Sequence, residues 1–135
     1  MNVNISKPYD HAVVFGVFDL FHEGHAYFLD QASLLCKSLT IVVTQDNIVE
    51  QLKQQIPHDN LETRIRAVQA NNPNAEVVPG DTILGTWSVF SSGNIDMAIL
   101  GYDQQGIASE LTKLNIPYVY VEAYKPEYFK SSLLR

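Results

Sequence analysis

Two histidines three positions apart, His22 and His25, are the residues of this sequence whose types and spacing most clearly suggest chemistry. Residues three apart share one face of a helix, so the two imidazoles would project together. They stand where a helix is predicted to begin, and the unpaired N–H groups and partial positive charge of a helix start attract anions. Gly24, between them, lets a ligand approach the backbone closely. The cluster therefore predicts a site that handles phosphate groups.

Two other interpretations of the histidine pair remain open at this point. Histidines at i and i+3 can bind zinc, but a zinc site normally needs three or four ligands. Asp19 would be a third ligand, and the sequence has no second Cys/His cluster. The pair could also be incidental helix residues, because short motifs often arise by chance. The elements that flank the pair are needed to decide.

Short apolar runs rich in β-branched residues alternate with helix-like stretches along the chain. The runs cover residues 12–15, 39–43, 76–78, 95–100 and 118–121. Continuous apolar runs are typical of strands buried on both faces of a parallel sheet. Between several of them, apolar residues recur at helical spacing. These sets are Phe28, Leu29, Ala32, Leu35 and Cys36; Leu61, Ile65 and Val68; and Ile107, Leu111 and Leu114.

Strands that alternate with helices of this length indicate right-handed βαβ crossovers. We therefore predict an α/β fold, a three-layer α/β/α Rossmann-like sandwich around a parallel sheet of about five strands. In such a sheet, ligands bind beyond the carboxyl ends of the strands. The post-strand segments 16–25, 44–46, 101–104 and 122–132 would then face one rim, and the histidine pair lies in the first of them.

The segment 16–25, Gly-Val-Phe-Asp-Leu-Phe-His-Glu-Gly-His, closely resembles the signature G-x-F-D-x-x-H-x-G-H of the cytidylyltransferase-like nucleotidyltransferases. The resemblance continues along the chain. Residues 100–104 look like the loop after the fourth strand in archaeal-type FAD synthases and in glycerol-3-phosphate cytidylyltransferases. Lys53 matches a lysine that contacts phosphate in such enzymes, and residues 62–64 resemble their E-x-R element.

Residues 125–132 lie where this family carries R-T-E-G-I-S-T-T, but the match is altered. Lys125 replaces the arginine, Tyr128 the glycine and Lys130 the first serine. Lysine cannot form the bidentate fork of arginine, which weakens the case for a specific CTP preference. Ser131 and Ser132 remain at the start of a final helical turn, where they would hold the β- and γ-phosphates.

The resemblance implies that a substrate phosphate attacks the α-phosphorus of a nucleoside triphosphate and releases pyrophosphate. CTP is the favoured nucleotide and ATP the next, and the acceptor would be a phosphorylated small molecule such as glycerol 3-phosphate or FMN. Mg²⁺ would arrive with the triphosphate, with no metal site made by the protein alone. A non-catalytic nucleotide-binding or regulatory module of the same fold is the alternative.

The resemblance also implies roles for individual residues. The catalytic residues would be His22, His25 and Lys53, and Asp19 and Arg64 would bind the acceptor. Residues predicted to bind the nucleotide are Gly16, Val17, Phe18, Asp19, Gly24, Gly101, Asp103, Gln104, Lys125, Phe129, Ser131 and Ser132.

The bulk properties of the chain restrict its class further. Its 135 residues fit one domain, residues 1–135. A formal net charge of −6 argues against binding nucleic acid or an anionic membrane, because both need a basic surface. The start of the chain lacks an apolar signal core and no apolar run approaches a membrane span, so we expect a cytoplasmic protein. The single cysteine, Cys36, is expected to be buried. The family often dimerises, which makes a homodimer plausible.

Overall fold

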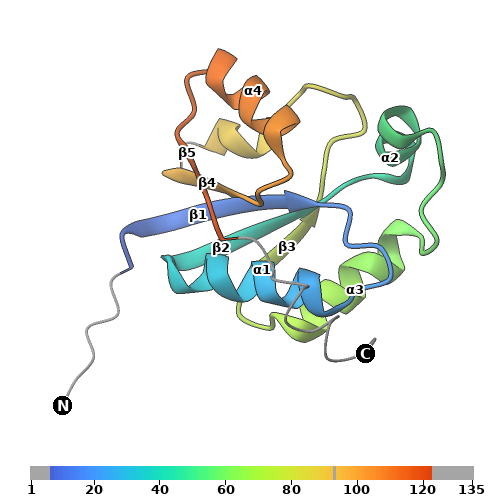
Figure 1. Ribbon diagram of the computed structural model, residues 1–135, viewed down its shortest axis with the longest axis horizontal. Helices are drawn as coiled ribbons and strands as arrows, with labels where there is room; N and C mark the ends of the chain where they lie inside the picture. Colours follow the sequence, from blue (N-terminus) through green and yellow to red (C-terminus); the bar gives the residue numbers. More distant parts are fainter. Residues whose placement is uncertain (1–6, 93, 123–135) are drawn as a thin grey trace, which may run out of the picture.

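The computed structural model describes residues 7–92 and 94–122, and its centre is one sheet of five strands in the order β3-β2-β1-β4-β5 (Figure 1). Every paired strand is parallel to its neighbour. The elements are β1 (Tyr9–Gly16), α1 (Glu23–Leu34), β2 (Cys36–Val43), α2 (Asp46–Lys53), α3 (Leu61–Asn71), β3 (Glu76–Pro79), the short 3-10 helix η1 (Ser88–Ser92), β4 (Met97–Leu100), α4 (Gln105–Lys113) and β5 (Tyr118–Tyr120). The predicted α/β class is confirmed.

The core lies in two layers because successive strand side chains point to opposite faces. On one face, Val14 of β1 clusters with Leu29 of α1 and Val68 of α3. On the other face, Val13 clusters with Leu111 of α4, and residues of η1 pack there too. Figure 1 shows α1 and α3 on one side of the sheet and α4 on the other. The predicted three-layer arrangement is therefore present.

Two local features differ from the sequence-based expectation. Cys36 was expected on the first helix, but that helix ends at Leu34 and Cys36 is the first residue of β2, paired with Tyr9. The connection is so short that the apolar spacing runs on into the strand. Helix α2 was not predicted at all, because only Ile48 and Val49 of its eight residues are buried.

The strand order places a switch point beside β1. From β1 the chain builds β2 and β3 on one side of it, and later builds β4 and β5 on the other. The loops that leave β1 and β4 consequently diverge, which opens a crevice at the carboxyl ends of these strands. Within residues 7–92 and 94–122, no helix is long and apolar enough to cross a membrane.

Candidate active site

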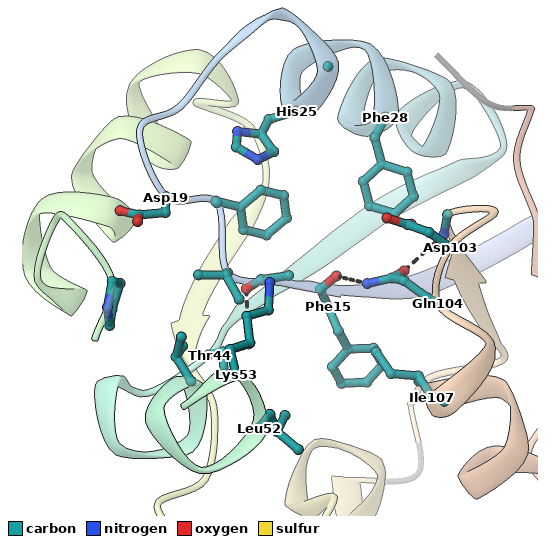
Figure 2. A pocket seen from close by; sticks show the side chains of 18 of the residues that line it. Phe15, Asp19, His25, Phe28, Thr44, Leu52, Lys53, Asp103, Gln104 and Ile107 are labelled. Atoms are coloured by element: carbon teal, nitrogen blue, oxygen red, sulfur yellow. Dashed lines mark hydrogen bonds between the residues drawn. The ribbon is translucent and has the colours of Figure 1, made fainter. Parts of the chain in front are cut away.

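A cavity of about 810 Å³ lies at the carboxyl ends of β1 and β4 (Figure 2). Its size falls within the range of about 300–1,000 Å³ that is typical of small-molecule sites. Its walls come from the loop after β1, the first turns of α1, the end of α2 and the loop into α4. The predicted site residues that line it are Gly16, Val17, Phe18, Asp19, His22, Gly24, His25, Lys53, Gly101, Asp103 and Gln104. Sequence reasoning therefore selected residues that the fold brings together, and their roles remain predictions.

The loop between β1 and α1 is tightly constrained at its start. Phe18 and Leu20 both adopt left-handed backbone conformations, with φ of 55° and 49°. The ring of Phe18 is 4% exposed and folds back beneath Gly16. A Cβ atom at Gly16 would lie 2.6 Å from the Phe18 Cζ atom, so the glycine of the motif is needed for this close approach.

The two histidines form a reciprocal cap at the start of α1. His22 is the N-cap residue, and its Nδ1 accepts a hydrogen bond from the Gly24 N–H at 3.0 Å. The Nδ1 of His25 accepts from the His22 N–H at 3.2 Å. Their rings stack with centroids 3.8 Å apart and planes 22° from parallel. The pair is thus held rigidly, and it satisfies N–H groups that a helix start otherwise leaves unpaired.

These hydrogen bonds determine which ring nitrogen carries the proton. An Nδ1 that accepts from a backbone N–H has no proton of its own, so a neutral imidazole carries it on Nε2. His22 and His25 are both in this state. Each therefore offers an Nε2–H donor, which suits an anionic ligand such as a phosphate.

Burial and, to a smaller extent, the neighbouring His22 lower the pKa of His25 from 6.5 to about 4, while Asp19 opposes both effects. His25 is consequently neutral at pH 7. The rings of Phe18 and Phe21 flank it, with centroids at 5.5 and 5.4 Å. This apolar enclosure is the physical cause of the desolvation.

Asp19 holds a neighbouring segment of chain. Its carboxylate oxygens accept hydrogen bonds from the N–H groups of His58 and Asp59, at 2.7 and 2.8 Å. Partial burial would raise the pKa of Asp19, but these two hydrogen bonds outweigh it, and the positive charge of Arg64 adds to them, so the net pKa is lowered. Asp19 is thus ionised and linked to the segment between α2 and α3.

Lys53 is the last residue of α2 and is exposed. Figure 2 shows Lys53 and His25 projecting into the cavity from opposite sides. Within the part of the chain that the structure describes, no hydrogen bond or ion pair engages its ammonium group. A cationic side chain in this position can neutralise the charge of a bound phosphate.

Gln104 joins the two central strands at the floor of the cavity. Its amide nitrogen donates to the Phe15 carbonyl of β1 at 2.8 Å, and its amide oxygen accepts from the Gly101 N–H at 2.9 Å (Figure 2). Asp103 lies on the same loop, and its Oδ1 would be 3.3 Å from a Cβ at Gly101. This loop is thereby shaped to leave open space above β1.

The family model described as cytidylyltransferase-like matches residues 13–135, which includes every element of this cavity. The chain belongs to the cytidylyltransferase-like family. Two relatives are named FAD synthases. The one from Thermococcus sibiricus is 34% identical, over 87% of this chain and 84% of that enzyme. The one from Thermococcus onnurineus is 32% identical, over 79% of each. These matches confirm the predicted enzyme class, and the chain is a nucleotidyltransferase.

Two solved structures share the fold of this nucleotidyltransferase. A lipopolysaccharide core biosynthesis protein from Thermoplasma volcanium has a TM-score of 0.71 at 23% identity, over 86% of this chain and 98% of that one. A protein of unknown function from Archaeoglobus fulgidus has a TM-score of 0.65 at 18% identity, over 82% and 88%. At these identities the likeness concerns the fold alone.

Arg64 does not lie where the nucleotidyltransferase resemblance implied. It was predicted to bind the acceptor, but its side chain is fully buried and does not line the cavity. Its guanidinium contacts Asp46 and three backbone carbonyls. An arginine enclosed in this way cannot reach an acceptor phosphate, so that prediction is wrong. Four residues that were predicted to bind the nucleotide lie outside the described residues: Lys125, Phe129, Ser131 and Ser132.

Sequence reasoning missed an apolar lip of the nucleotidyltransferase cavity, which we define as Leu52, Ile56 and Tyr102. They are 61%, 70% and 58% exposed, although all three line the cavity. Exposed apolar groups at the mouth of a cavity often mark a ligand contact. No motif marks Leu52 or Ile56, because each stands alone in a polar stretch of sequence, and the loop resemblance over residues 100–104 gave no role to Tyr102.

Residues 7–92 and 94–122 contain no group of three or more His, Cys, Asp or Glu side chains that could hold a metal ion. The zinc interpretation of the histidine pair thus gains no support from these residues.

Proposed function

We propose that this protein transfers the adenylyl group of ATP to FMN, forming FAD and pyrophosphate. The observation that carries the proposal is the pair of neutral imidazoles, His22 and His25, which present Nε2–H donors to a cavity of sufficient size. The FAD synthase relatives support ATP and FMN as the substrate pair.

The state of the histidines favours an acceptor that is already ionised. Each Nδ1 lone pair is occupied by a backbone N–H, so neither ring offers a base to the cavity. A phosphate monoester has a second pKa of about 6 and is largely a dianion at pH 7. It needs no base to become a nucleophile, whereas an alcohol acceptor would need one. Two histidines that donate hydrogen bonds but offer no base therefore suit a reaction in which the acceptor phosphate is the nucleophile.

In the proposed reaction an oxygen of the FMN phosphate forms a bond to the α-phosphorus of ATP. The bond from that phosphorus to the β-phosphate oxygen breaks, and its electron pair leaves with pyrophosphate. Negative charge grows on the α-phosphate oxygens and on the leaving group. His22 and His25 would donate to these oxygens and Lys53 would add positive charge, so that catalysis depends on positioning and charge stabilisation.

The apolar lip supports a flat, apolar acceptor. An isoalloxazine ring that covers Leu52 or Ile56, or that stacks on Tyr102, removes exposed apolar area from water. Glycerol 3-phosphate offers no comparable apolar surface. The lip thus favours FMN over the glycerol 3-phosphate that the sequence resemblance also implied.

Mg²⁺ is proposed to enter with the triphosphate. Mg²⁺ commonly binds substrate phosphates, several waters and only one or two carboxylates. The donors at this cavity fit that mode, because the carboxylates of Asp19, Asp103 and Glu122 line it without forming, within the described residues, a group that could hold a metal ion by itself. The ion would neutralise phosphate charge, and the protein residues would hold the nucleotide that carries it.

The proposal is tested by incubating the protein with Mg²⁺ and each of ATP and CTP, combined with either FMN or glycerol 3-phosphate. Pyrophosphate and the coupled product are measured together. We expect FAD and an equal amount of pyrophosphate from ATP with FMN. Turnover of CTP with glycerol 3-phosphate alone would overturn the choice of substrates.

A parallel measurement of ATP binding by thermal shift separates catalysis from binding, because a ligand of the folded state raises its apparent stability. ATP binding without pyrophosphate release from any of these pairs would favour the non-catalytic module over the enzyme.

A further inference from the structure

We propose that Arg64 is a positioning residue, whose buried guanidinium ties the loops after β1 and β2 to the start of α3 and so holds the histidine pair in place. This inference rests on the phosphate-handling role proposed above for His22 and His25. It gives Arg64 a function that replaces the contact with the acceptor predicted from the sequence.

The contacts of Arg64 join three separate segments. Its Nε donates to the Asp59 carbonyl at 2.9 Å, just before α3. Its Nη1 donates to the Val17 carbonyl at 2.9 Å, after β1, and to the Thr44 carbonyl at 2.8 Å, after β2. Its Nη2 pairs with the carboxylate of Asp46, the first residue of α2. One side chain thus connects the ends of both strands that lie beside the site.

Asp19 closes these contacts into a ring. The Asp19 carboxylate accepts from the N–H of Asp59, and the carbonyl of Asp59 accepts from Arg64, which in turn donates to Val17. Residues 17–19 are therefore held at both ends by one neighbouring segment. Thr44 adds a further tie, because its N–H and its hydroxyl both donate to the Gly16 carbonyl, at 3.0 and 3.1 Å.

Phe18 connects this closed set of hydrogen bonds to the histidines. Its backbone lies between the two anchored residues Val17 and Asp19, in a left-handed conformation at φ 55°. Its buried ring makes an edge contact with the imidazole of His25 at 5.5 Å. If residues 17–19 moved, the phenyl ring of Phe18 would move with them, and His25 would lose the apolar contact that keeps it desolvated.

Arginine is the side chain that these contacts require. Its planar group carries five N–H donors in a rigid fork, whereas lysine has three on a single nitrogen and cannot reach carbonyls on different sides. Arg64 is 0% exposed, so its charge must be paired and hydrogen-bonded. Three hydrogen bonds to backbone carbonyls and the ion pair with Asp46 meet that need.

The test compares Arg64→Lys with Arg66→Lys as the matched control. Arg66 lies two positions along α3 and its side chain is 71% exposed. Glu62 is its one ion-pair partner among residues 7–92 and 94–122, so its substitution should change nothing. Three quantities are measured at a temperature where each variant is folded. They are kcat and KM for ATP, binding of ATP by thermal shift, and the ¹⁵N spectra of the imidazoles, which report the protonation of each ring nitrogen.

For Arg64→Lys we expect kcat to fall by about 10- to 100-fold, because small misplacements of catalytic groups have effects of this size. KM for ATP should change much less, and the spectrum of His25 should lose the pattern of an Nδ1 acceptor. A variant with the kcat and imidazole spectra of the original protein, and only a lower Tm, would overturn the proposal.

Asp46→Asn covers the case in which Arg64→Lys does not fold. Asp46 has a 44% exposed side chain, and asparagine keeps its shape while removing the ion pair. We expect a smaller fall in kcat and altered imidazole spectra, and unchanged values of both would overturn the proposal. If FMN proves not to be the acceptor, the imidazole spectra still test whether Arg64 positions the histidines, because they are recorded without substrate.

Discussion

The imidazole of His25 has both a structural role and a proposed chemical role. Its Nδ1 caps the helix start, and its Nε2–H remains for a ligand. Because burial lowers its pKa to about 4, the ring stays an uncharged donor across the physiological range. A neutral donor does not bind pyrophosphate as tightly as a cation would, which favours release of the product.

The lowered pKa of His25 makes stability depend on pH. Between pH 6.5 and about 4 the unfolded chain binds a proton at this ring and the folded chain does not, so folding loses stability as the pH falls through that window. We expect the free energy of unfolding of the original protein to fall relative to that of His25→Gln between pH 7 and pH 4. Urea unfolding at a series of pH values measures this difference. A difference that stays constant over the range would contradict the assigned state of the ring.

Substitution of Gly16 tests the close packing between this residue and the ring of Phe18. We expect Gly16→Ala to lower the free energy of unfolding by about 1–3 kcal/mol, as overpacked sites do, because its Cβ would meet the buried ring of Phe18. Gly106→Ala is the control, since nothing lies within 4 Å of its Cβ and alanine favours a helix by about 0.5–1 kcal/mol. Denaturant unfolding of the two variants should show changes of opposite sign, and equal changes would count against the close approach.

At the scale of elements, α2 carries Lys53 and part of the apolar lip to the site. It ends at Gln54 in the left-handed conformation, with φ of 58°. We expect Gln54→Gly to stabilise the protein by about 1 kcal/mol, because glycine avoids the cost of that conformation. Gln51→Gly, inside the same helix, should destabilise it by about 1 kcal/mol. Thermal unfolding of both variants measures the contrast, and a loss of stability in Gln54→Gly would argue against this helix end.

The elements differ in how far the sequence could predict them. The strands on either side of β1 were predicted because continuous apolar runs are unambiguous when a sheet is covered on both faces. Helix α2 escaped prediction because it covers little of the core and buries only Ile48 and Val49. The role of Arg64 escaped because arginine is normally exposed, and nothing local in the sequence shows that segments 20 and 47 residues away enclose it.

At the scale of the whole molecule, the site depends on strand order. The motif after β1 was recognisable from sequence. Its position relative to Lys53 depends on β2 pairing with one side of β1, and its position relative to Gln104 depends on β4 pairing with the other side. Local sequence patterns cannot specify on which side of β1 a later strand pairs. The homodimer also remains a prediction, and light scattering of the purified protein would decide it.

The central claim is that the α-phosphorus of ATP passes to FMN at the histidine pair. The most direct measurement follows ATP labelled separately at its α- and γ-phosphorus atoms, with the original protein and with His25→Ala. We expect the α-label in FAD and the γ-label in pyrophosphate, and a rate lower by about 10²–10³ in the variant, as for the loss of one transition-state donor. An α-label that never reaches FMN although the folded protein binds ATP, or an unchanged rate in His25→Ala, would contradict the claim.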